Sequence, residues 1–169
     1  MAQVVIVNGP AGVGKTTVCR MLAQRQAGTI NISGDVLRQF APPDARDHLG
    51  AGSTYRAAAA LTTSYLDMGA PRVLFDYVFE GAEKLAIFRR GLPSNASVHV
   101  FTLWAPVDQI IHREATREGR DRLGDTVLAT FNALSRNLGT LGLVVSNTET
   151  AEAAAQTILD EIVRAERTA

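Results

Sequence analysis

The sequence predicts an α/β fold in which a mainly parallel, five-stranded sheet is sandwiched between helices. Short runs of β-branched residues alternate along the chain with longer segments of helical periodicity, which is the pattern of a parallel sheet with crossover helices. Several of the runs are almost wholly apolar, as expected for strands that are covered on both faces. The chain has 169 residues, the length of one domain, and we expect 1–169 to form a single one.

Each expected element follows from its local pattern. The strands are short apolar or β-branched runs, at 4–7, 29–32, 72–76, 98–104 and 143–146. The helices have apolar residues three and four positions apart, at about 15–27, 53–68, 80–91, 106–118, 124–138 and 150–166. Turn-forming residues dominate APPDARDHLGAG, 41–52, which we interpret as a mobile loop within the domain.

The composition limits the classes of partner. The chain has 17 basic and 17 acidic residues, so no net charge draws it to nucleic acid or to an anionic membrane, and no obligate protein partner is evident. Its one cysteine, Cys19, excludes an internal disulfide and is expected to be a small buried residue. We find no signal peptide and no apolar run of the roughly 20 residues that span a membrane. These features favour a cytoplasmic protein whose partners are small molecules.

The most specific motif is GPAGVGKT, which matches the phosphate-loop pattern G-x-x-x-x-G-K-[ST] between an expected strand and an expected helix. Its glycines allow backbone N–H groups to point inward at phosphate oxygens. Lys15 can reach the outer phosphates, and the Thr16 hydroxyl can ligate Mg²⁺. The residues predicted to bind the nucleotide are Gly9, Pro10, Ala11, Gly12, Val13, Gly14, Lys15, Thr16 and Thr17.

Among phosphate-loop proteins, a small-molecule kinase fits the rest of the chain best. The guanine-reading Asn-Lys-x-Asp of GTPases is absent, and Asp-x-x-Gly occurs only at 47–50 and 121–124, neither of which follows an expected strand. The chain is also short for a ring ATPase module with its additional helical domain. A kinase needs bound Mg²⁺, positive charge around the transferring group and a residue that positions the acceptor hydroxyl.

Candidates for the metal and for the positive charge can be named. Asp76 ends the apolar run RVLFD, at the edge where open α/β sheets bind ligands, and is predicted to hold Mg²⁺ with Thr16. A small lid is predicted at about 113–125, where the acidic neighbours leave open the alternative of a solvated helix end with paired charges. Its arginines are Arg113, expected to bind the nucleotide, Arg117 and Arg120, expected to assist catalysis, and Arg122.

Asp35 is the candidate for the base. It follows the second expected strand, twenty residues after Lys15. If that strand neighbours the first one, the carboxylate stands beside the γ-phosphate, where it can accept the proton of an acceptor hydroxyl or orient the attacking oxygen. The alternative is that Asp35 is only the N-cap of the following helix.

The order of these motifs resembles the chloramphenicol phosphotransferase-like group of P-loop kinases. The matching stretches are the phosphate loop, ISGD, VLFDYVFEGAEKLAIFRRGLP, VHVFTLWAP and REATREGRDR, and more distant likenesses are to shikimate and gluconate kinases and to zeta toxins. The resemblance implies a single-domain P-loop kinase fold, ATP and Mg²⁺ as cofactors, Asp35 as general base, RVLFD as the third strand and an arginine-bearing lid.

The acceptor is expected to be a small amphiphilic alcohol, because apolar residues and arginines are mixed in 36–57 and beyond. The residues predicted to contact it are Asp35, Arg38, Arg56 and Tyr77, where either arginine could bind a carboxylate or phosphate. The predicted function is transfer of the γ-phosphate of ATP to a hydroxyl of this molecule. The alternatives are a nucleoside or nucleotide kinase and, in another class, a nucleotide-binding switch with a protein partner.

Overall fold

Five strands form one all-parallel sheet at the centre of the molecule, as the sequence predicts. The computed structural model describes residues 2–116 and 123–168. The sheet has the order β2-β3-β1-β4-β5, and every pairing in it is parallel. The strands are β1 (Gln3–Asn8), β2 (Thr29–Ser33), β3 (Arg72–Asp76), β4 (Ser97–Trp104) and β5 (Leu143–Ser146).

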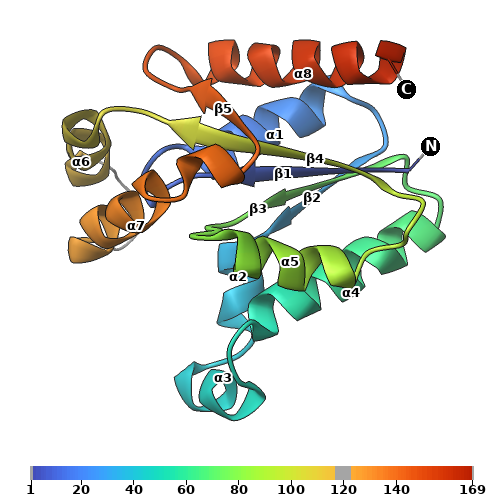
Figure 1. Cartoon of the computed structure of the whole chain (residues 1–169), viewed down its shortest axis with the longest axis horizontal. Coiled ribbons are helices and arrows are strands. Elements are labelled where there is room, and N and C mark those ends of the chain that lie inside the picture. The colour runs from blue at the N-terminus through green and yellow to red at the C-terminus, as the bar shows by residue number, and fades with distance from the viewer. Residues whose placement is uncertain (1, 117–122, 169) are drawn as a thin grey trace.

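Helices cover both faces of this sheet (Figure 1). In the view shown, α1 and α8 lie above the sheet and α4 and α5 below it, while α6 and α7 lie at one end and α3 projects from the lower side. The helices are α1 (Lys15–Arg25), α2 (Gly34–Gln39), α3 (Pro43–Leu49), α4 (Ser53–Asp67), α5 (Ala82–Arg90), α6 (Val107–Ala115), α7 (Asp125–Ser135) and α8 (Ala151–Thr168), with a 3₁₀ turn at Leu138–Thr140.

The sheet separates two apolar cores, which explains why its central strands are apolar throughout. Val5 and Val7 of β1 pack in the core with α1 and α8, whereas Val4 and Ile6 pack in the core with α4 and α5. Successive side chains of a strand point to opposite faces, so a strand covered on both sides is buried at every position. Cys19 lies fully buried in the first of these cores, as the sequence predicts.

The condition placed on β2 is not met, and the interpretation of residues 41–52 as a loop is wrong. β2 does not neighbour β1, because β3 lies between them and Ser33 pairs with Asp76 instead. Residues 41–52 are not one loop, since they contain α3. Proline at the first position of α3 supplies the φ angle that a helix requires, and Gly50 ends the helix with a φ of 77°.

None of the helices in the described ranges is long and apolar enough to cross a membrane.

Candidate active site

A cavity of about 290 Å³ opens at the carboxyl edge of the sheet and contains most of the predicted site residues. Open α/β sheets bind their ligands at this edge. The lining comes from the phosphate loop and α1, from α2 and α4, from the β3–α5 connection and α5, and from the region of α7. The residues are Ala11, Gly12, Gly14, Lys15, Thr16, Thr17, Asp35, Arg38, Tyr55, Tyr77, Val78, Glu80, Lys84, Leu123, Thr126 and Thr130.

Gly9, Gly12 and Gly14 of the phosphate loop all have positive φ angles, a backbone conformation that glycine adopts without strain. Gly14 has a φ of 104°, and a Cβ atom there would lie 2.9 Å from the Asn147 Nδ2 atom. Lys15 folds back over the loop, where its Nζ atom donates hydrogen bonds to the carbonyls of Gly9 (2.9 Å) and Pro10 (3.0 Å). The ammonium group is therefore held against a glycine-rich loop that precedes the N-terminus of α1, and such a loop and helix end are suited to bind phosphate.

Two residues outside the motif fix this loop. The Ala11 N–H donates to Thr130 Oγ1 of α7 over 3.0 Å, and Asn147 Nδ2 donates to the Val13 carbonyl over 2.7 Å. Both bonds are buried and join segments that lie more than a hundred residues apart in the sequence. No local pattern marks either residue, so the sequence analysis missed them.

Asp76 lies at the end of β3, as predicted, and is 2 % exposed. Its Oδ2 atom is buried and accepts no hydrogen bond within the described part of the chain. Burial raises the pKa of this carboxyl group, and the hydroxyls of Thr16 and Ser33 and the charge of Lys15 oppose that shift. A buried carboxylate oxygen with a free lone pair near a threonine hydroxyl suits an oxygen-liganded divalent cation. The residues present therefore fit Mg²⁺.

Asp35 is not the N-cap of α2. The strand before it ends at Ser33, which occupies the N-cap position, and Asp35 is the second residue of the helix. Its side chain lines the cavity together with that of Arg38, which lies about one helical turn further on. The cap alternative is therefore wrong, and Asp35 shares one cavity with Lys15 despite the different strand order.

Gly34 explains how α2 reaches this position. A Cβ atom on Gly34 would lie 2.3 Å from Cδ2 and 2.4 Å from Cγ of Tyr77, so the Tyr77 ring packs directly on the glycine. Any larger residue would push α2 away from the β3–α5 connection. The glycine of ISGD thus sets the distance between Asp35 and Tyr77.

The predicted acceptor residues divide into two groups. Asp35, Arg38 and Tyr77 line the cavity, but Arg56 does not, and its guanidinium donates instead to the carbonyls of Leu49 (2.8 Å) and Ala51 (2.9 Å). Arg56 therefore stabilises the turn between α3 and α4 from outside this cavity, and its contact with an acceptor stays a prediction. Which carbonyls the guanidinium meets depends on how this turn folds, which the sequence does not reveal.

Only the two ends of the predicted lid, 113–116 and 123–125, lie within the residues that the structure describes. Arg113 does not line the cavity; its Nη1 donates to the Asn147 carbonyl over 2.7 Å, which holds the segment after β5 beside the phosphate loop. Arg117, Arg120 and Arg122 lie outside the described residues. Between β3 and α5, by contrast, the structure reveals a polar network that the sequence analysis missed.

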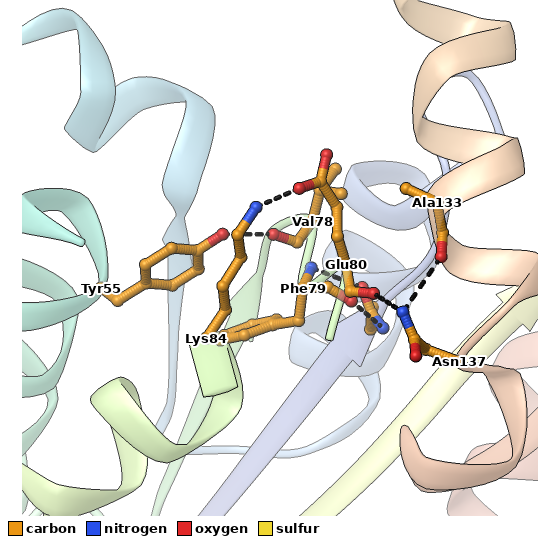
Figure 2. A network of polar contacts seen from close by, with 8 residues as sticks. Tyr55, Val78, Phe79, Glu80, Lys84, Ala133 and Asn137 are labelled. Atoms are coloured by element: carbon orange, nitrogen blue, oxygen red, sulfur yellow. Dashed lines mark hydrogen bonds and ion pairs between the residues drawn. The ribbon is translucent and has the colours of Figure 1, made fainter. Parts of the chain in front are cut away.

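Figure 2 shows this network around Val78, Phe79 and Glu80. The Tyr55 hydroxyl donates to the Val78 carbonyl over 2.7 Å, and its burial raises the pKa of Tyr55. Lys84 of α5 pairs with the Glu80 carboxylate, and both side chains line the cavity. An i, i+4 acid–base spacing at 80 and 84 is the only sequence signal for this pair.

Comparison with known protein families shows to which family the chain belongs. The sequence profile described as an AAA domain matches residues 4–141, which is most of the chain. The chain belongs to the AAA domain family. No curated protein sequence matches this chain significantly.

Solved structures share the whole architecture of this AAA domain protein. A sugar kinase from Janibacter sp. HTCC2649 superposes with a TM-score of 0.69 at 21% identity, covering 95% of this chain and 94% of its own. A gluconokinase from Sinorhizobium meliloti 1021 gives 0.73 at 15% identity, covering 98% and 94%. The tunicamycin resistance protein of Deinococcus radiodurans gives 0.63 at 20% identity, covering 92% and 93%. The chain therefore has the fold of the small-molecule P-loop kinases, as its motifs predict.

Proposed function

We propose that this protein is an ATP-dependent phosphotransferase that moves the γ-phosphate to a hydroxyl group of a small molecule. The observation that carries the proposal is that Asp35 and Lys15 line the same cavity, although they come from different helices. A nucleotide-binding switch has no acceptor alcohol and needs no carboxylate at that place. The kinases among the proteins of the same fold support the proposal.

The residues have distinct tasks in this reaction. Backbone N–H groups of the phosphate loop and the Lys15 ammonium bind the phosphates, and Thr16 and Asp76 would hold Mg²⁺, which neutralises charge on the phosphates when bound. The oxygen of the acceptor hydroxyl bonds to the γ-phosphorus while the bond from that phosphorus to ADP breaks, and Asp35 accepts the proton of this hydroxyl. The transferred proton ends on the Asp35 carboxylate, from which water removes it.

The nucleotide has a second contact region next to the loop. Arg113 fixes the backbone of Asn147 and Thr148 through bonds of 2.7 and 3.5 Å, and Asn147 in turn holds the phosphate loop. We propose that the part of the nucleotide remote from the phosphates contacts this region. Arg113 then acts on nucleotide binding by positioning that backbone, while the catalytic assignments of Arg117 and Arg120 stay predictions.

A screen for the acceptor tests this function. The protein is incubated with ATP, Mg²⁺ and a panel of hydroxylated metabolites and antibiotics, and products are detected by the mass increase of one phosphoryl group. We expect at least one acceptor to gain this mass, and Lys15→Met to lose both nucleotide affinity and transfer. Slow ATP hydrolysis with no phosphorylated acceptor would favour the switch and contradict the proposal.

A further inference from the structure

Glu80 and Lys84 form an ion pair on the acceptor side of the cavity, by which we mean the part lined by Asp35, Arg38, Tyr55, Tyr77, Glu80 and Lys84. Their side chains are 36 % and 33 % exposed, so each is partly buried in the wall and partly open to the cavity. Neither has a role in binding phosphate or metal in the proposed reaction. The pair is therefore available to contact the acceptor.

The backbone that carries Glu80 is held firmly in place. The Phe79 N–H donates to Asn8 Oδ1 (2.8 Å), and Asn8 Nδ2 donates to the Phe79 carbonyl (3.1 Å). The Val78 carbonyl accepts from Tyr55, and the Glu80 carbonyl accepts from Asn137 Nδ2 over 2.8 Å. The connection is thus tied to β1, to α4 and to the turn that follows α7. A binding residue gains selectivity when its backbone is fixed in this way.

The charges on the acceptor side balance. Asp35 and Glu80 are acids and Arg38 and Lys84 are bases, so the described lining of this side carries no net charge. Lys15 does not enter this sum, because it lies over the phosphate loop. A lining without net charge does not favour a carboxylated or a cationic acceptor over an uncharged one through its overall field.

We infer that Glu80 and Lys84 are specificity-determining residues that select an uncharged, polyhydroxylated acceptor, an inference that rests on the proposed function. One hydroxyl of the acceptor donates to the Glu80 carboxylate and another accepts from the Lys84 ammonium, since a hydroxyl can do both. The rings of Tyr55 and Tyr77, in edge contact at 5.4 Å between centroids, supply an apolar wall beside these polar groups. A carboxylate in the same place meets Glu80 as a like charge and is repelled.

Binding of matched acceptors tests this inference without requiring chemistry. Each set has one carbon skeleton in a neutral, a carboxylated and an aminated form, beginning with glucitol, gluconate and glucamine and continuing with pentitol and cyclitol sets. Affinities are measured by calorimetry with the full chain saturated with ADP and Mg²⁺. We expect the neutral member of at least one set to bind about tenfold more tightly than its charged partners, a moderate ratio because Glu80 and Lys84 are each about one-third exposed and solvent screens their charges.

Charge variants make the test specific to the pair. Glu80→Gln should raise the affinity ratio of gluconate to glucitol, Lys84→Gln should raise the ratio of glucamine to glucitol, and the double variant should restore the preference for the neutral form. Glu83→Gln is the matched control, because Glu83 is exposed on α5 and does not line the cavity. It should change neither ratio.

The outcomes separate this inference from the proposed function. Tightest binding of a charged member, no binding in any set, or charge variants that behave like Glu83→Gln overturn the inference. Transfer of phosphate to a carboxylated acceptor overturns it while the kinase function stands. Selective binding of neutral acceptors without any transfer from ATP supports the inference and overturns the kinase function instead.

Discussion

Replacing Asn8 by alanine should destabilise the protein much more than the small size of the change suggests. Asn8 is the last residue of β1 and is fully buried. Its side chain exchanges two hydrogen bonds with the backbone of Phe79 (2.8 and 3.1 Å) and donates a third to Thr102 Oγ1 (3.2 Å). Alanine removes all three bonds and leaves the partner groups in the interior.

The size of this destabilisation depends on which partner groups are left without a hydrogen bond. The N–H and C=O groups of Phe79 are buried, and within residues 2–116 and 123–168 they bond only to Asn8; leaving such a group unpaired costs roughly 1–3 kcal/mol. The Thr102 hydroxyl still donates to the Leu141 carbonyl over 2.6 Å, so it adds little. We therefore expect Asn8→Ala to lower the free energy of unfolding by about 2–6 kcal/mol.

Urea unfolding, followed by circular dichroism, measures this loss. Asn137→Ala is the matched control, because Asn137 is exposed and its loss removes the bond to the Glu80 carbonyl without orphaning a buried pair. Its expected effect is about 0.5–1.5 kcal/mol. If Asn8→Ala costs no more than this control, Asn8 does not hold the β3–α5 connection and the reasoning is refuted.

Three further changes probe other parts of the site. Gly34→Ala places a Cβ atom 2.3 Å from the Tyr77 ring and should cost about 1–3 kcal/mol in thermal unfolding and reduce phosphoryl transfer; wild-type stability would show that α2 does not rest on that ring. Asp76→Asn should stabilise the protein at neutral pH in chelator, because burial raises the pKa of Asp76 and so disfavours its charged form in the fold. The same change should weaken Mg²⁺ binding in a melting titration. The stability gain should shrink as the pH falls through the raised pKa, where wild-type Asp76 becomes neutral, and a gain that grows on acidification contradicts this account. Tyr55→Phe removes the donor to the Val78 carbonyl and should cost about 1 kcal/mol in urea unfolding and raise the KM of the acceptor more than that of ATP, whereas an equal rise in both would not fit.

Features with a local physical cause could be predicted from the sequence. The central strands could be found because burial on both faces leaves apolar residues at every position, as in β1 and β3. The phosphate loop could be found because glycines and a lysine at this fixed spacing, between a strand and a helix, are specific to phosphate binding. The position of Asp76 at the edge of the sheet could be predicted because it ends an apolar run.

The strand order could not be predicted, because periodicity within a strand does not tell which strand is its neighbour. β2 is an edge strand. The only sign of this in the sequence is that Thr29 and Asn31, which the structure shows to be half-buried and exposed, are polar. Asp35 reaches the cavity nonetheless, since Gly34 allows the start of α2 to pack closely against Tyr77, which follows β3. The bonds of Thr130 and Asn147 to the phosphate loop likewise depend on how separate segments pack, which no local pattern encodes.

Single-turnover transfer by Asp35→Asn tests the central claim most directly. Asparagine keeps the size of the side chain but cannot accept a proton from the acceptor, so the transfer rate should fall about 10²–10⁴-fold while the affinity for ATP is unchanged. Asp44→Asn, an exposed acid on α3, should leave both quantities at their wild-type values. Transfer by Asp35→Asn at the wild-type rate would contradict the account, because the carboxylate in the cavity would then have no part in the reaction.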